Sequence, residues 1–119
     1  MLARSNRVLD AAGFRRVMRS GAKTTTPHLV VYRSPLGGSA PQVGIVVSGK
    51  YGNAVKRNRV RRRIRAIMYS KIQSGDVLVD VVFRLRADAG EASWDDVVSE
   101  IEPLDFGNVP SRQNVRTAP

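Results

Sequence analysis

Apolar residues recur along the chain with two different periods, and the change of period marks the predicted elements. Near the N-terminus, Phe14, Val17 and Met18 follow a helical spacing, and Gly21 stands where a helix commonly ends. Two short β-branched runs follow at residues 29–32 and 43–47, separated by a segment rich in Ser, Pro and Gly. The simplest prediction is a short helix followed by a hairpin of two strands.

The longest predicted helix lies in the second half of the chain. After the turn-forming pair Gly52 and Asn53, one helical stripe runs as far as Gly75, and its members are Val60, Ile64, Ile67, Met68 and Ile72. Residues 77–83 form an apolar strand pattern, and Ser93 opens a last helix with a capping-box signal. The predicted order is αββαβα, a two-layer α+β sandwich with one small sheet.

Length and composition indicate one globular domain. The chain has 119 residues, of which 42% are hydrophobic and 25% charged, enough for one modest core. We expect a single domain over residues 1–106 and a flexible polar tail over residues 107–119. No apolar run is long enough to span a membrane and the N-terminal residues do not resemble a secretory signal, so we expect a soluble cytoplasmic protein.

The side-chain inventory excludes most metal and thiol chemistry. The sequence contains no cysteine and a single histidine, His28, which removes disulfides, Cys-ligated zinc and multi-histidine metal sites. Asp76 and Asp80 have no other candidate ligand nearby in the sequence, so a structural role is the simpler interpretation. Trp94 is expected to anchor the core, and His28 to begin a strand.

Charge is distributed very unevenly. The net charge is +10, yet residues 1–75 contain sixteen Lys and Arg and one Asp, whereas residues 76–119 contain four Arg and nine Asp and Glu. The first segment therefore carries +15 and the second −5. Such an excess of positive charge predicts a polyanionic partner.

The basic residues are concentrated around the longest helix. Residues 50–75 contain no acid and nine cations: Lys50, Lys56, Arg57, Arg59, Arg61, Arg62, Arg63, Arg65 and Lys71. Like charges three and four positions apart destabilise this helix by about 1 to 3 kcal/mol, so stability alone does not explain them. Guanidinium groups suit phosphate oxygens, which favours a nucleic acid over a merely solvated surface. Because no helix-turn-helix pair surrounds the helix, RNA is favoured over DNA.

Residues 48–65 read Ser-Gly-Lys-Tyr-Gly-Asn-Ala-Val-Lys-Arg-Asn-Arg-Val-Arg-Arg-Arg-Ile-Arg. This string resembles the signature of the bacterial ribonuclease P protein subunit, which carries Arg-Asn-Arg, two basic residues after one spacer, and a further Arg. The positions that match it are Arg57, Asn58, Arg59, Arg61, Arg62 and Arg65. Two positions depart from the family pattern: Gly49 stands where Lys is common, and Met18 where an aromatic residue is common.

The resemblance implies a fold and a division of labour. The family fold is a small α+β sandwich with a left-handed βαβ crossover, also found in the second domain of ribosomal protein S5. The protein subunit supplies no catalytic residue and no metal site. It joins a catalytic RNA, the RNase P RNA, which hydrolyses precursor tRNA with Mg²⁺ bound mainly by RNA and releases the 5′ leader. The implied partners are these two RNAs, with no membrane and no protein partner.

The resemblance also implies two groups of site residues. Contact with the catalytic RNA is expected from Lys50, Lys56, Arg57, Asn58, Arg59, Arg61, Arg62 and Arg65. A cleft for the 5′ leader is expected from Phe14, Met18, Tyr32, Ser48 and Ala54. For Phe14 and Tyr32 a core position is an equally good interpretation, because aromatic residues on amphipathic elements are commonly buried.

Two other functions remain open from the sequence. A ribosomal or other structural RNA-binding protein would have similar size, charge and fold class. A protein nuclease that acts alone is a weaker hypothesis, because the basic segment offers one acid and one histidine for a general base or a metal site.

Overall fold

The computed structural model describes residues 11–86 and 93–109. Within them the chain forms a mixed α+β fold, which confirms the predicted class. The elements in chain order are α1 (Ala11–Ser20), β1 (Ala22–Thr25), β2 (Leu29–Ser34), β3 (Val43–Val46), the short 3-10 turn η2 (Gly49–Tyr51), α2 (Ala54–Gln73), β4 (Asp80–Leu85) and α3 (Trp94–Ile101). Most of the predicted tail, residues 110–119, lies outside the described residues, while Val109 packs against the core.

The four strands form one sheet in the order β1-β2-β4-β3. β1 pairs antiparallel with β2 and β2 with β4, whereas β3 runs parallel to β4. The predicted hairpin between residues 29–32 and 43–47 is therefore wrong, because β4 lies between these two strands. β4 takes the centre because its first four residues are all buried, so it can be covered on both edges and both faces.

The strand count and the strand bounds also differ from the prediction. β1 was not predicted, because the sequence Ala-Lys-Thr-Thr has no alternating apolar residues; it forms the actual hairpin with β2. The strand expected at residues 77–83 begins at Asp80 instead. Val77 and Val79 are buried, but they precede the ladder. β3, α2 and β4 form a βαβ unit with parallel strands.

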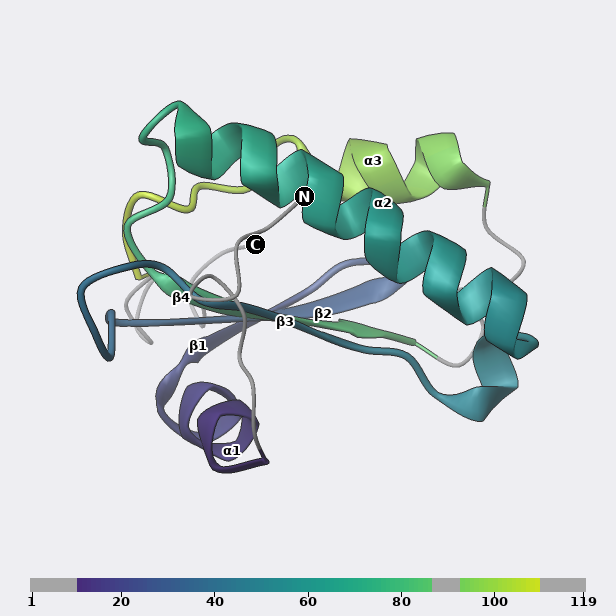
Figure 1. The fold of residues 1–119 in the computed structure, drawn as a ribbon, viewed down its shortest axis with the longest axis horizontal. Coiled ribbons are helices and arrows are strands. Elements are labelled where there is room, and N and C mark those ends of the chain that lie inside the picture. Colours follow the sequence, from purple (N-terminus) through teal and green to yellow (C-terminus); the bar gives the residue numbers. More distant parts are fainter. Residues whose placement is uncertain (1–10, 87–92, 110–119) are drawn as a thin grey trace.

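Helices cover both faces of the sheet (Figure 1). α2 and α3 lie on one face and α1 on the other, so the fold has three layers where two were predicted. The reason is the apolar character of both faces. The larger buried cluster lies under α2 and α3, whereas Val17 of α1 joins Val30, Tyr32 and Val82 in a second buried cluster.

The apolar stripe of α2 positions the whole helix. Val60, Ile64 and Met68 are buried in the larger cluster, as predicted, and Ile67 and Ile72 pack at its edge. Because these residues face the sheet, most of the remaining α2 side chains are turned toward solvent, whereas Tyr69 also packs against the core. Within the described residues no helix has the length and apolar character that crossing a bilayer would require.

A buried aspartate fixes α1 against the sheet. Asp80 has no exposed surface, and its carboxylate accepts hydrogen bonds from Arg16 Nη2 at 2.6 Å, Gln42 N at 2.8 Å and Gly37 N at 3.0 Å. Gly21 then ends α1 where the chain passes very close to other backbone, since a Cβ there would lie 2.5 Å from Val17 O. The position of α1 thus depends on local chain geometry and on one buried ion pair.

Candidate nucleic-acid interface

The first turns of α2 present a row of polar and basic side chains. Asn53 caps the helix, as predicted, because its Oδ1 accepts a hydrogen bond from Lys56 N at 2.9 Å. Among the residues predicted to bind the catalytic RNA, Lys50, Lys56, Asn58, Arg59 and Arg62 are exposed, and Arg57, Arg61 and Arg65 are half-buried. The structure places seven of the eight on α2 and Lys50 on η2, the turn that precedes it.

Arg57 is engaged with the protein itself. Its guanidinium Nη1 donates a hydrogen bond to Gly52 O at 2.7 Å, so the side chain folds back over the turn that precedes α2. Arg61 makes a weaker local contact, from its Nη1 to Asn58 Oδ1 at 3.1 Å.

A separate open cleft of about 720 Å³ lies on the sheet face that also carries α1. One cross-strand row crosses all four strands, since Thr25 pairs with Val30, Val30 with Arg84, and Arg84 with Val46. All four side chains line the cleft, together with Lys23, Ser48, Lys50, Leu85 and Arg86. We call this surface the sheet cleft. Its lining contains four cations and no acid among the described residues.

The five residues predicted for the leader are placed differently from one another. Ser48 lines the sheet cleft. Phe14 and Met18 are half-buried and pack with Tyr32, which retains 7% exposure, in the second buried cluster that also includes Val30 and Val46. Ala54 is exposed at the start of α2 and is not among the residues that line the sheet cleft.

Three basic residues of the sheet cleft were not predicted from the sequence as site residues. Lys23 belongs to the unpredicted strand β1, and Arg84 and Arg86 follow Val82 at every second position at the end of β4. That alternation was a usable signal, because residues two apart on a strand lie on one face. Arg86 is held in place by a hydrogen bond from its Nη1 to Thr26 O at 3.3 Å.

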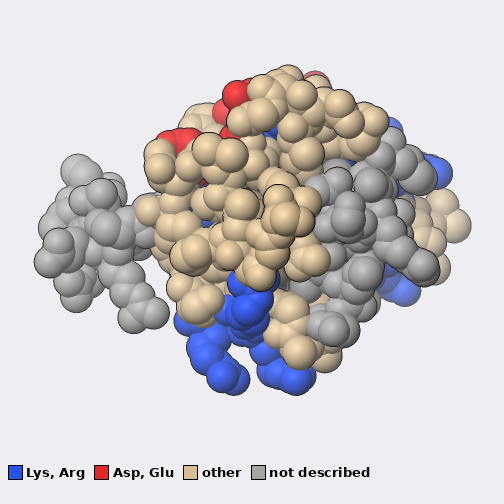
Figure 2. Space-filling model, turned by 60° about the vertical axis from the view of Figure 1, so that its left-hand side comes forward, with Lys and Arg blue, Asp and Glu red and all other residues tan. Residues whose placement is uncertain are grey.

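A further group of cations covers the outside of α1. On the face shown in Figure 2, Lys and Arg gather at the lower end of the molecule, where α1 lies in Figure 1, and Asp and Glu lie near the top. Arg15 and Arg19 of α1 are exposed. Arg33, in contrast, is buried, and burial lowers the pKa of its guanidinium while Asp105 opposes that shift. The positive surface of α1 is thus formed by its exposed arginines, whereas a buried arginine such as Arg33 does not contribute to the molecular surface.

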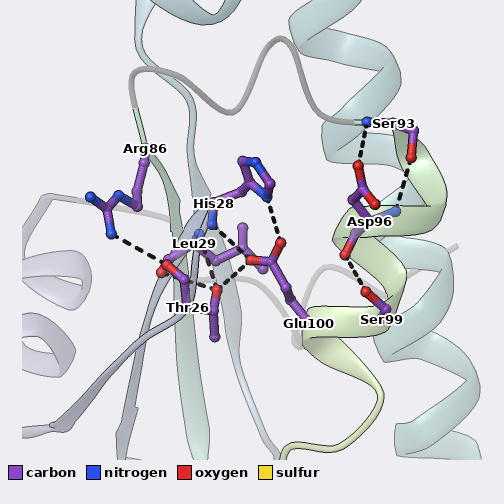
Figure 3. Close-up of polar contacts among 8 residues, drawn as sticks. All are labelled: Thr26, His28, Leu29, Arg86, Ser93, Asp96, Ser99 and Glu100. Atoms are coloured by element: carbon purple, nitrogen blue, oxygen red, sulfur yellow. Dashed lines mark hydrogen bonds and ion pairs between the residues drawn. The ribbon is translucent and has the colours of Figure 1, made fainter.

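The single histidine is part of a structural contact between the β1–β2 connection and α3 (Figure 3). Glu100 Oε2 lies 2.6 Å from His28 Nδ1, and Glu100 Oε1 accepts hydrogen bonds from His28 N at 2.8 Å and from the Thr26 hydroxyl. Burial alone would raise the pKa of Glu100, but the hydrogen bonds from Thr26 and His28 lower it overall. The same figure shows the predicted capping box between Ser93 and Asp96.

The buried acid Asp80 and the single histidine are engaged within the fold, whereas basic residues line its open surfaces. In the described part of the chain, no three His, Asp or Glu side chains converge where they could hold a metal ion. Asp80 is occupied by Arg16, and His28 by Glu100. What the described residues do provide is two basic surfaces, α2 on one side of the sheet and the sheet cleft on the other.

Comparison with known protein families identifies the family of this chain. Residues 2–105 match the family model described as ribonuclease P. The chain belongs to the ribonuclease P protein family. Membership makes an RNase P RNA its partner and tRNA processing its field of action, and it favours this function over a ribosomal protein.

Curated relatives and solved structures agree with the ribonuclease P family. A ribonuclease P protein component from Clavibacter michiganensis is 39% identical over 104 residues, covering 85% of this chain and 90% of that protein. One from Acidothermus cellulolyticus is 32% identical over 116 residues and covers 96% of both. The solved RNase P protein of Staphylococcus aureus superposes with a TM-score of 0.74 at 27% identity, over 85% of this chain and 97% of that chain.

Proposed function

We propose that the protein is the RNA-binding subunit of a ribonucleoprotein endonuclease that removes the 5′ leader of precursor tRNA. In this proposal the RNase P RNA performs the hydrolysis, and Mg²⁺ is bound mainly by RNA. The observation that carries the proposal is the pairing of two basic surfaces on opposite faces of one sheet. Both RNAs are products of bacterial transcription, which places the complex in the cytoplasm.

The surface along α2 is assigned to the catalytic RNA. Asn58, Arg59 and Arg62 are exposed on one helix whose opposite side is fixed in the core, so their spacing is rigid. Arginine binds two phosphate oxygens through its planar fork, and such charge-assisted contacts are stronger than neutral hydrogen bonds. The repulsion that these cations cause in the free helix is relieved when phosphates lie between them.

The sheet cleft is assigned to the single-stranded leader. Lys23, Lys50, Arg84 and Arg86 provide positive charge for its phosphates, and Ser48 offers a hydroxyl group among them. Phe14, half-buried on α1, provides an aromatic ring at the adjoining cluster for stacking with an unpaired base. Phosphate contact and stacking accept every base, so we expect weak sequence preference in the leader.

Cleavage of precursor tRNA tests the division of labour. The assay compares purified protein alone, RNase P RNA alone, and both together at low Mg²⁺ concentration. We expect no cleavage by the protein alone and restored cleavage by the mixture. Robust cleavage by RNA-free protein would contradict the proposal.

Binding of precursor and mature tRNA tests the sheet cleft. Arg84→Gln in the cleft and Arg15→Gln on the outside of α1 remove one charge each, so the second variant is a matched control. In the assembled complex, we expect Arg84→Gln to reduce the preference for precursor over mature tRNA, with little change in affinity for the RNase P RNA. Equal losses for precursor and mature tRNA would reject the cleft as the leader site.

A further inference from the structure

A small cavity of about 120 Å³ lies between the first turns of α2 and the start of α3. It is distinct from the sheet cleft, because α2 and α3 cover the opposite face of the sheet. Its lining combines two aromatic rings, Tyr51 and Trp94, with three cations, Lys56, Arg59 and Arg63. None of the described residues that line it is a carboxylate.

In this cavity, a cation lies over each of the two aromatic rings. The guanidinium carbon of Arg63 lies 5.4 Å from the centre of the Trp94 ring, and Lys56 Nζ lies 5.2 Å from the centre of the Tyr51 ring. Both distances are within the range of cation–π contact. Trp94 is half-buried and packs against the edge of the core, while part of its ring is accessible at the cavity. The cavity therefore presents an aromatic surface beside concentrated positive charge.

We propose that this cavity binds one unpaired nucleotide of the RNase P RNA, with its base stacked on Trp94 and its phosphate held by Arg59 and Arg63. The inference rests on the proposed function, since it refines the α2 surface assigned to that RNA. Stacking platforms flanked by Arg and Lys are the usual way in which proteins hold unpaired nucleotides. The cavity is larger than a water site and below the roughly 300 Å³ of a drug-sized pocket, a size suited to one ring system.

A purely structural role explains these residues less well. Arg59 and Arg63 are four residues apart on one face of α2, and with Lys56 they bring three like charges to a single cavity. Packing of Trp94 alone would need none of these charges. A nucleotide uses both features, because its base suits the ring and its phosphate suits the cations. The leader of precursor tRNA is assigned to the opposite face of the sheet, so the catalytic RNA is the partner in reach.

Trp94 is itself the reporter for the test, because it is the one tryptophan in the chain. The protein is titrated with RNase P RNA while binding is followed separately by filter retention and Trp94 emission is recorded. We expect the emission to be quenched in parallel with binding, and the ring to become protected from acrylamide. Unchanged emission at saturation would overturn the inference, as would stronger quenching by precursor tRNA alone.

Variants separate stacking from folding and from general charge. Trp94→Leu keeps apolar volume but removes the aromatic surface, and we expect about tenfold weaker binding of RNase P RNA, equivalent to one stacked base. Trp94→Phe is expected to restore most of the affinity. Arg63→Gln keeps the reporter and is compared with Arg19→Gln on α1, a matched loss of one exposed charge. We expect weaker binding and reduced quenching for Arg63→Gln and neither for Arg19→Gln.

Failure of the inference and failure of the proposed function give different results. If Arg62→Ala, at an exposed residue of α2 outside the cavity lining, weakens binding of RNase P RNA while Trp94→Leu does not, the α2 surface stands and the nucleotide site is wrong. If neither variant affects binding, the assignment of α2 to the RNA is wrong as well. Melting temperatures identify a variant that fails to fold. In that case the quenching of Trp94 emission in the wild-type protein on binding RNase P RNA tests the nucleotide site.

Discussion

Individual basic residues of this protein have different physical roles that their shared charge conceals. Arg33 is buried within the fold, Arg16 pairs with the buried carboxylate of Asp80, and Arg57 donates to the carbonyl of Gly52. Arg59 and Arg62, by contrast, are exposed on α2. The count of 20 Lys and Arg residues therefore overstates the positive charge that an RNA can contact, because some of these residues stabilise the fold instead.

Arg57 and Arg59 are expected to separate stability from RNA binding. Arg57→Ala removes the hydrogen bond to Gly52 O, so we expect the free energy of unfolding to fall by about 0.5 to 1.5 kcal/mol. Arg59→Ala removes an exposed side chain, so its effect on stability should stay within about 0.5 kcal/mol. Thermal unfolding measures the difference, and equal melting temperatures for the two variants would show that the contact to Gly52 contributes nothing.

Asp80 is expected to be the most sensitive single polar residue. In Asp80→Asn the side chain loses its charge and one acceptor oxygen, although Arg16 Nη2, Gly37 N and Gln42 N all still require an acceptor. Breaking a buried ion pair costs about 3 to 5 kcal/mol. The Arg16 side chain is 39% exposed and can be hydrated, so we expect the lower end of that range. Urea unfolding is the measurement, with Asp76→Asn, an exposed acid, as the control.

At the scale of elements, local signals identified the helices, whereas pairing between strands required the structure. The cap at Asn53, the capping box at Ser93 and the stripe of α2 depend on residues within a few positions of one another. The position of β4 between β2 and β3 depends on burial along the whole strand and on the α2 crossover. Two β-branched runs with a turn-rich connection look like a hairpin whichever strand finally separates them.

The same distinction applies to the candidate interface. The basic residues of α2 could be located from the sequence because a helix presents its side chains in an order set by local geometry. Arg84 enters the sheet cleft because it pairs with Val30 on one side and Val46 on the other. Lys23 could not be placed without β1. A site assembled across strands therefore needed the register, which no local pattern supplies.

The contact between Glu100 of α3 and the β1–β2 connection should make stability depend on pH. Hydrogen bonds to the Glu100 carboxylate lower its pKa in the folded state below the ordinary value of 4.5. A lowered pKa means that the contact stabilises the fold fully above pH 4.5 and that this contribution is lost as the pH falls through the folded-state pKa. We expect Glu100→Gln to reduce the free energy of unfolding at pH 7 by about 1.5 to 3 kcal/mol.

Urea unfolding at a series of pH values measures this effect. As the pH falls below 4.5 and through the lowered folded-state pKa, the wild-type carboxyl becomes protonated and resembles the amide, so the difference between the two proteins should shrink. Glu102→Gln, on an exposed acid at the end of α3, controls for the change in net charge. A difference that stays constant between pH 7 and the acid range would mean that Glu100 acts through packing.

At the scale of the whole molecule, the sheet separates the two basic surfaces that the proposed function assigns to two different RNAs. α2 lies on one face, and the sheet cleft opens on the other. A protein so arranged can lie between a catalytic RNA and its substrate, and it neutralises phosphates on both sides. The free protein is destabilised by this arrangement, because the like charges along α2 repel one another when no phosphate is bound.

Salt should therefore act in opposite directions on the free protein and on its complex. Added salt screens the repulsion within α2, so we expect the melting temperature of the free protein to rise. The affinity for RNase P RNA should fall instead, because each neutralised phosphate contributes about 0.7 to 0.9 to the slope of log affinity against log salt. Of the eight cations of α2, Arg57 donates to Gly52 O and Lys71 pairs with Glu102. If the other six, Lys56, Arg59, Arg61, Arg62, Arg63 and Arg65, each neutralise one phosphate, the slope is about −4 to −5. Arg59→Gln should make that slope shallower by about 0.7 to 0.9, and it should also reduce the salt dependence of the melting temperature. An affinity that hardly changes with salt would exclude α2 as the principal RNA-binding surface.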